Sequence, residues 1–122
     1  MKIFFYIMVL LHILAEGIAG VVLLFSPTML VADAVGGGLQ YTTLYGSAGI
    51  TMAALVGWLW PYRRSVEVLT VALGTFATFH TLVALGGAVA GVEGGMGILA
   101  MHGIFAICFW ILWAKRQSLA AS

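Results

Sequence analysis

Four long runs of apolar residues alternate with short polar or glycine-rich connections along this chain of 122 residues. The runs extend over residues 3–25, 39–60, 66–85 and 96–113, with ends defined to within about two to four residues. Each is about 20 residues long, which is the length that an α-helix needs to cross a hydrocarbon core of about 30 Å. The pattern predicts an all-α polytopic membrane protein, a single domain built as a four-helix transmembrane bundle.

Prolines and glycines mark the ends of these runs. Pro27 stops the first run because proline cannot continue helical hydrogen bonding, and Pro61 stops the second. Three glycines, Gly36–Gly38, lead into the second run, and the third run gives way to the glycine-rich segment Gly86–Gly97. We expect one turn of interfacial helix in the first connection and a short polar tail over residues 117–122.

The composition excludes several classes of protein. With 63% hydrophobic and 7% charged residues, the chain lies far from soluble domains, in which about a quarter of residues are charged. A net charge of +1 without a basic run argues against nucleic acid, and a single cysteine, Cys108, excludes disulfides and cysteine-based metal sites. The first run resembles a signal peptide, but Glu16 interrupts it and it continues to Phe25, so we expect an uncleaved span.

The charged residues indicate an orientation. Asp33 and Glu93 lie in the two connections at one end of the predicted spans. The five basic residues all fall at the other end: Lys2, Arg63, Arg64, Lys115 and Arg116. By the positive-inside rule both termini are expected in the cytoplasm, with the protein crossing the inner membrane several times.

An ionisable pair interrupts the first apolar run. His12 and Glu16 are four residues apart, so they lie on one face of a helix, and the apolar residues around them place both deep in a bilayer. A charge at that depth costs roughly 2.5–3.5 kcal/mol on insertion scales. We therefore expect this face to contact protein or a wet cavity rather than lipid.

Other polar side chains are predicted at a similar depth. At about 1.5 Å per residue, Glu16 lies roughly 13 Å from the outer end of its span and His12 roughly 19 Å. The same count gives roughly 8–10 Å for Tyr45, His80 and His102. Glu16, Tyr45, His80 and His102 share this level, which we call the polar layer, with Tyr41 above it and His12 below it. The candidate ligand-binding residues are these six: His12, Glu16, Tyr41, Tyr45, His80 and His102.

Several roles for this layer are open. The histidines can serve as interhelical hydrogen bonds, which contribute about 0.6 kcal/mol each. Two neutral imidazoles at equal depth, His80 and His102, are also what a haem or a zinc or copper ion requires, although no CxxCH or HxxxH pattern is present. An apolar pocket with polar groups at its mouth also suits a quinone or a sterol. A proton relay through Glu16 and the histidines is a further possible role of the layer, but four helices are few for a stand-alone proton pump.

Small residues recur at helical spacing in two of the runs. Gly49, Ala53 and Gly57 repeat every four residues in the second run, and Gly97 and Gly103 belong to a similar series in the fourth. Such stripes allow helix backbones to approach closely, either inside one bundle or between the protomers of a homo-oligomer.

The whole chain resembles the DoxX-like group of small bacterial four-helix membrane proteins. The resemblance lies in FSP at the end of the first run, LYGSAGITMAAL in the second, TFHTL in the third and MHGIFAICFW in the fourth. It implies an inner-membrane four-helix protein, and some members of the group are subunits of quinone-linked oxidoreductases. It carries no catalytic signature and no residue-level role to this chain.

Two functions are consistent with these features. In the first, an outward-facing polar pocket in the membrane binds a small lipophilic or redox ligand, with haem, a quinone or a transition metal as the candidate cofactors. In the second, the chain is a non-catalytic accessory or structural subunit of a larger membrane complex. No catalytic residue is expected, and the sequence leans away from an enzyme.

Overall fold

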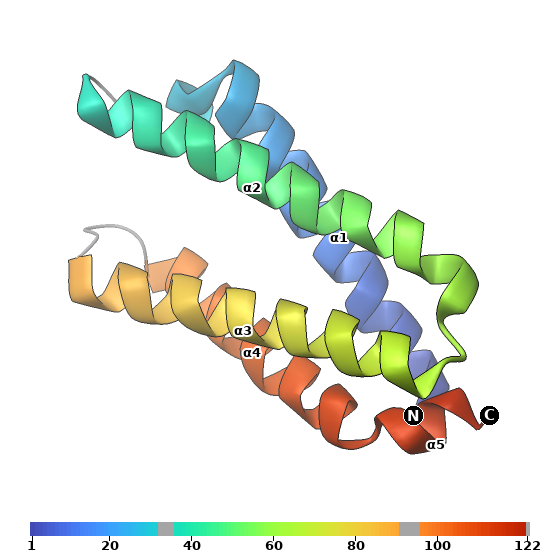
Figure 1. Ribbon diagram of the computed structural model, residues 1–122. Helices are drawn as coiled ribbons and strands as arrows, with labels where there is room; N and C mark the ends of the chain where they lie inside the picture. The colour runs from blue at the N-terminus through green and yellow to red at the C-terminus, as the bar shows by residue number, and fades with distance from the viewer. Residues whose placement is uncertain (32–35, 91–95, 122) are drawn as a thin grey trace. The chain divides into compact units, whose positions relative to one another are not determined.

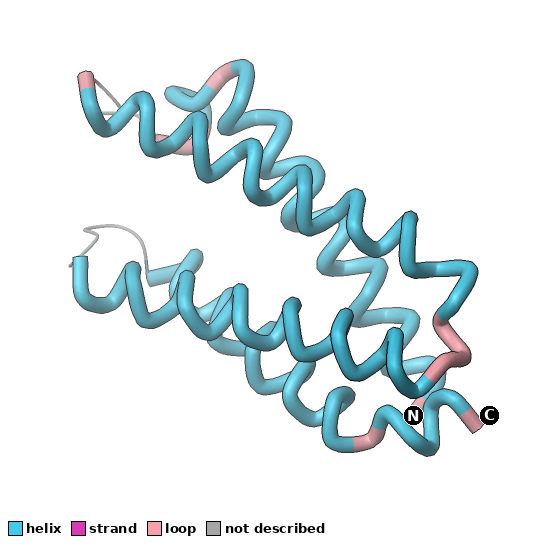
Figure 2. The backbone as a smooth tube through the Cα atoms, in the orientation of Figure 1, coloured by secondary structure: helices cyan, strands magenta, loops and turns pink. Residues whose placement is uncertain are grey.

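The computed structural model describes residues 1–31, 36–90 and 96–121, and nearly all of them are helical (Figures 1 and 2). These residues contain no β-strand, which confirms the predicted all-α class. The elements are α1 (Lys2–Phe25), η1 (Pro27–Met29), α2 (Gly37–Leu59), η2 (Trp60–Tyr62), α3 (Val66–Ala90), α4 (Met96–Ala114) and α5 (Arg116–Ala120), where η1 and η2 are single 3₁₀ turns.

The chain divides into two compact units, which we describe separately. The first unit consists of Met1–Met8 and Pro61–Ser122, and the second consists of Val9–Trp60. Helix α1 is continuous and contributes its first turns to the first unit and the remainder to the second.

In the first unit, α3 and α4 lie side by side (Figure 1). The two helices bury apolar side chains at spacings of three and four residues, which is the pattern of a helix with one buried stripe. Leu73 and Ala77 of α3 and Phe109 and Leu112 of α4 have at most 1% of their surface exposed. This stripe holds the two helices together.

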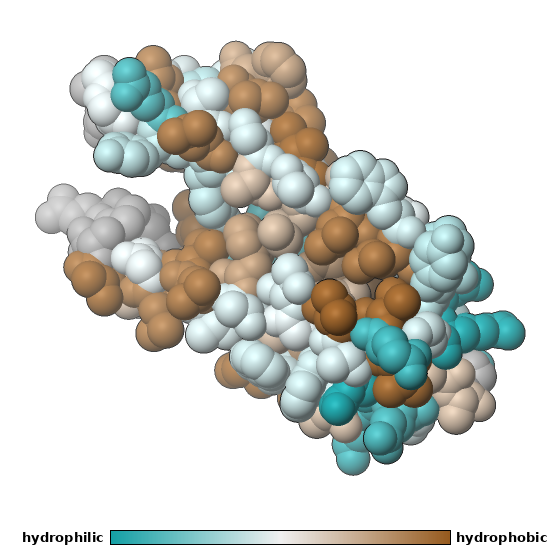
Figure 3. All heavy atoms as spheres, viewed as in Figure 1, coloured by the Kyte–Doolittle hydropathy of each residue, from teal (hydrophilic) through white to brown (hydrophobic). Residues whose placement is uncertain are grey.

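The opposite face of α4 is apolar and exposed. Ile104, Ile107 and Ile111 follow one another at three- and four-residue spacing and are 45–64% exposed. On the face shown in Figure 3, hydrophobic residues cover much of the surface, and hydrophilic residues of the first unit gather where the two termini lie. An outward apolar face with polar groups at one end is typical of a helix that contacts lipid.

In the second unit, α1 and α2 cross at glycines. A Cβ atom placed on Gly46 would lie 2.7 Å from the carbonyl oxygen of Gly20, and one on Gly20 would lie 2.8 Å from the carbonyl oxygen of Gly46. Only glycine permits backbones to approach this closely, as in small-residue crossings of membrane helices.

Three of the described helices are long and apolar enough to cross a membrane: Lys2–Phe25, Val66–Val89 and Met96–Ala114. They match the first, third and fourth predicted spans and indicate a membrane protein. Helix α2 forms where the second span was predicted. It is long enough to cross a membrane, but it is not apolar enough to count with the other three helices. The difference arises in its first half, where Gln40, Thr42 and Thr43 lower its mean hydropathy.

The serine and threonine hydroxyl groups of α2 are nevertheless hydrogen-bonded inside the helix. Each of four side chains donates a hydrogen bond to the carbonyl oxygen four residues earlier, at 2.7–3.3 Å: Thr42, Thr43, Ser47 and Thr51. Such back-bonding removes the unpaired donor that would be most costly in an apolar environment. The polar half of α2 is therefore compatible with membrane insertion.

Two ends differ from their predicted positions. Helix α3 continues to Ala90, beyond the predicted end at Leu85, because each of the two glycines that follow, Gly86 and Gly87, costs a helix only about 1 kcal/mol relative to alanine. The predicted polar tail forms α5 instead, and Leu119 within it is buried. Asp33 and Glu93, which helped to set the orientation, lie outside the described residues.

Candidate functional site

The first unit contains a buried pair of histidines. His80 of α3 and His102 of α4 have 0% and 1% of their surface exposed, and their Nδ1 atoms are 2.8 Å apart. At this distance one Nδ1 carries a proton and donates it to the lone pair of the other. The two rings are therefore in opposite tautomeric states and are joined by one hydrogen bond between the helices.

Phenyl rings hold the histidine pair in place. The His80 ring stacks on Phe105 and on Phe109, with centroid distances of 4.7 Å and 5.6 Å. The ring of Phe79 meets both imidazoles edge-on, at 5.3 Å from His80 and 6.3 Å from His102. These contacts fix the orientation of the imidazoles and surround their polar atoms with apolar surface.

The sequence places both histidines on buried stripes. His80 follows Leu73, Phe76 and Ala77 on the face of α3 that packs on α4, at intervals of three or four residues. On α4, His102 begins the buried series that continues through Phe105, Ala106, Phe109 and Leu112. Because the spacing of each series matches the helical repeat, the two imidazoles project from buried faces of their helices.

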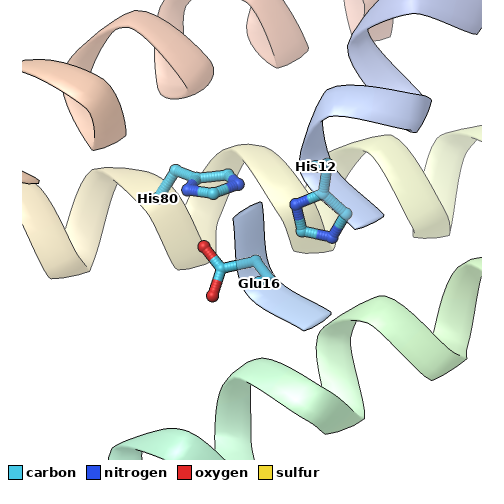
Figure 4. Close-up of side chains that lie close together, drawn as sticks. All are labelled: His12, Glu16 and His80. Atoms are coloured by element: carbon cyan, nitrogen blue, oxygen red, sulfur yellow. The ribbon is translucent and has the colours of Figure 1, made fainter. Parts of the chain in front are cut away.

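The second unit holds the ionisable pair of α1. His12 and Glu16 are both buried. Their side chains project from successive turns of α1 (Figure 4). Nε2 of His12 lies 3.4 Å from the carbonyl oxygen of Met52 in α2, a long hydrogen bond that requires the Nε2–H tautomer. This contact confirms that His12 faces protein.

Glycine leaves room for the carboxylate of Glu16. A Cβ atom on Gly49 of α2 would lie 3.1 Å from Oε2 of Glu16 and 3.0 Å from its carbonyl oxygen. A larger residue at this position would press on the carboxylate. The close crossing of α1 and α2 therefore continues past Gly20 and Gly46 to the level of Glu16.

The two tyrosines of α2 differ in their surroundings. Tyr45 is half-buried and lies close enough to Glu16 to interact with it electrostatically. Tyr41 is 75% exposed. Of the two, Tyr45 is the one that the second unit associates with the Glu16 carboxylate.

The geometry of the histidine pair bears on metal binding. Two imidazole nitrogens that share a tetrahedral zinc ion at about 2.0–2.1 Å are separated by about 3.3 Å, and two axial ligands of a haem iron by about 4 Å. The 2.8 Å between the two Nδ1 atoms is shorter than either distance. As placed, these atoms make a hydrogen bond and do not fit joint ligation of one ion.

The predicted site residues thus form one group in each unit. The first unit joins His80 to His102, and the second associates His12, Glu16 and Tyr45 with the α1–α2 crossing. Their predicted common level in the membrane rests on the depth count and stays a prediction. The phenyl rings around the histidines were not predicted, although their spacing from His80 and His102 was a signal that could have revealed them.

Comparisons with protein-family models, curated proteins and solved structures found no match to this chain. The resemblance to the DoxX-like group therefore stays a prediction from the sequence.

Proposed function

We propose that this protein binds a small lipophilic ligand within the inner membrane, and that the His80–His102 pair holds the polar end of that ligand. The observation that carries the proposal is the buried hydrogen bond between the two imidazoles of α3 and α4. Intramembrane ionisable groups are expensive and are found mostly where a ligand, an ion or a proton must be handled.

The Nδ1–Nδ1 hydrogen bond places the two rings in complementary tautomers, so a ligand that reaches their Nε2 atoms, in competition with the contacts that these rings already make, would meet one donor and one acceptor. The ring that donates through Nδ1 has an acceptor at Nε2, and the ring that accepts at Nδ1 has an Nε2–H donor. A carbonyl oxygen can accept from the donor, and a hydroxyl group can donate to the acceptor. The oxidised and reduced forms of a quinone present these two groups, which makes a quinone the redox ligand that suits the pair best.

A wide, open groove on the surface of α3 lies next to the pair, and we propose it as the place of an apolar tail. It has a volume of about 490 Å³ and is lined by Val71, Gly74, Thr75, Thr78, Phe79 and Leu82. Phe79 belongs to this groove and also contacts both histidine rings. A ligand whose tail occupies the groove would therefore be separated from the histidines by one phenyl ring.

The groups of the second unit are linked to the histidine pair only through the depth count. Glu16 and Tyr45 are expected at the level of the histidine pair, with His12 about one turn deeper. That shared level is an expectation from the sequence, and the ligand contacts proposed here are those of the first unit alone. Four membrane crossings, with α2 as the second, and both termini in the cytoplasm belong to the same proposal.

A second candidate is an accessory subunit of a larger membrane complex. The hydrogen bond between His80 and His102 favours this candidate, because a histidine pair can hold two helices together without binding any ligand. The exposed isoleucines of α4 would then contact a partner helix instead of lipid.

A ligand screen separates the two candidates. The purified protein would be melted in detergent with a short-chain ubiquinone, a menaquinone analogue and a sterol, and its absorption spectrum and metal content would be measured. A ligand at 100 times its dissociation constant stabilises the folded state by about 2.7 kcal/mol. We expect such a shift with a quinone, and neither a Soret band nor stoichiometric metal.

Variants make the screen specific to the histidine pair. His80→Phe/His102→Phe should abolish the quinone-induced shift. Gly103→Ala is the matched control, because it neighbours His102 on α4 and a Cβ atom there meets nothing within 4 Å. Unchanged melting of the wild-type protein with every ligand would reject the proposal in favour of the accessory role.

A further inference from the structure

Three contacts hold Arg116 in one orientation at the junction of α4 and α5. Its Nε donates to Oγ1 of Thr70, and its Nη1 donates to the carbonyl oxygen of Trp113, both at 2.8 Å. Its Cζ lies 4.1 Å from the centroid of the Trp113 ring, which is a cation–π arrangement. The guanidinium is therefore ordered by the protein itself.

The residues that hold Arg116 are fixed in turn. Oγ1 of Thr70 donates its proton to the carbonyl oxygen of Val66 at 2.7 Å, which leaves its lone pairs to accept from Arg116. Nε1 of Trp113 donates to the carbonyl oxygen of Thr70 at 3.1 Å. This network ties the first turns of α3 to the end of α4.

The same contacts leave part of the guanidinium available. Only Nε and one N–H of Nη1 are engaged by the acceptors found among the described residues. The other N–H groups, on Nη1 and Nη2, form a planar edge of donors. Such an edge matches the oxygens of a phosphate group, and because little side-chain freedom remains to be lost, binding there costs less entropy.

The surroundings of Arg116 are strongly basic. All five Lys and Arg residues of the chain belong to the first unit: Lys2, Arg63, Arg64, Lys115 and Arg116. The acidic residue among the described residues of this unit is Glu67, whose carboxylate accepts a hydrogen bond from Ser65 at 2.7 Å. Hydrophilic residues gather at this end of the unit, where the two termini lie (Figure 3).

The position of Arg116 along the helix indicates the source of the phosphate. The candidate membrane span of α4 ends at Ala114, so a bilayer crossed by this helix would have Lys115 and Arg116 at the level of its headgroups. Trp113 is of the residue type that is enriched at that interface. A phosphate that meets Arg116 at this depth is most readily that of a phospholipid.

We propose that this end of the first unit binds the headgroup of an anionic phospholipid, with Arg116 contacting the phosphate and Lys115 supplying additional positive charge. The proposal is independent of the ligand proposed for the histidine pair. It concerns a different end of the same helices and requires only that α4 reaches the membrane surface.

Native mass spectrometry of the full chain tests the proposal. Protein purified in a neutral detergent would be titrated with dioleoyl phosphatidylglycerol or dioleoyl phosphatidylcholine. We expect tighter binding of phosphatidylglycerol. Lys115→Gln should weaken that binding about five-fold, because one basic residue near the membrane surface contributes about that factor. Arg116→Gln should weaken it further, since it removes the charge together with the planar donors.

Lys2→Gln is the matched control, because it removes one charge from the same unit without removing the Arg116 donors. Equal losses in Lys2→Gln and Arg116→Gln would overturn the proposal in favour of a diffuse effect of net charge. Equal binding of the two lipids would also overturn it, as would displacement of phosphatidylglycerol by millimolar inorganic phosphate. Should Arg116→Gln fail to fold, the exposed Lys115 still provides the test.

Discussion

Replacing the two buried histidines by phenylalanine, singly and together, tests the hydrogen bond on which the site is built. His80→Phe leaves Nδ1 of His102 facing a phenyl ring, and His102→Phe does the same to His80. Phenylalanine preserves a planar ring at each position, so the stacking of residue 80 on Phe105 and Phe109 is retained. The substitutions therefore remove the polar contacts of the imidazoles and keep the ring packing.

The structure allows the size of the effect to be estimated. Each histidine is at most 1% exposed, so a lone Nδ1 cannot turn to water. Leaving one buried polar group unsatisfied is destabilising, whereas replacing both partners by apolar groups can be nearly neutral. Interhelical hydrogen bonds in membrane proteins average about 0.6 kcal/mol, with values up to about 1.7 kcal/mol. The double variant should therefore cost less than the sum of the single variants by about 0.6–1.7 kcal/mol.

The assay is equilibrium unfolding in mixed micelles of dodecyl maltoside and sodium dodecyl sulfate, followed by far-ultraviolet circular dichroism. The four proteins form a double-mutant cycle, and the coupling energy is obtained directly from their free energies of unfolding. Additive costs, within about 0.3 kcal/mol, would show that the two rings do not interact. That result would refute the hydrogen-bonded pair.

Three further predictions concern packing, topology and the groove. Gly46→Ala should destabilise the protein by about 1–3 kcal/mol in the same unfolding assay, because its Cβ atom would meet the backbone of Gly20. At Gly57, where a Cβ atom meets nothing within 4 Å, alanine should stabilise α2 by up to about 1 kcal/mol. Tags on both termini should resist external protease in spheroplasts. Cleavage of one tag alone would put the termini on opposite sides of the membrane, which would indicate three crossings and exclude α2 as a membrane span. Thr78→Phe should fill the groove and abolish stabilisation by ubiquinone, and an unchanged shift would place the ligand elsewhere.

Run length and periodicity in the sequence were enough to predict the helices. Four apolar runs of about 20 residues gave α1–α4, because in so apolar a chain the hydrogen bonds of the backbone must be made within each segment. The same reasoning predicted His80 and His102 at equal depth on two helices; that depth stays a prediction, and the structure shows in addition that the two rings are in contact. Depth along a helix can be counted from the sequence.

Contacts that depend on the register and rotation of helices could not be predicted in this way. The sequence does not say that Nδ1 of His80 meets Nδ1 of His102, because that contact depends on how α3 and α4 turn about their axes. The end of α3 was also missed, because two consecutive glycines, Gly86 and Gly87, weaken a helix without having to end it. The Arg116 network links residues 46 positions apart and has no local signal.

Nitrogen-15 magnetic resonance of the histidine rings, recorded in lipid bilayers, tests the central claim most directly. Protein labelled at histidine would be measured with and without a short-chain ubiquinone, alongside His80→Phe/His102→Phe. We predict one protonated and one unprotonated Nδ1 in the pair without ligand, and a saturable change in the Nε2 resonances of both rings on addition of ubiquinone. Resonances of the pair that ubiquinone leaves unchanged would contradict the proposed ligand site.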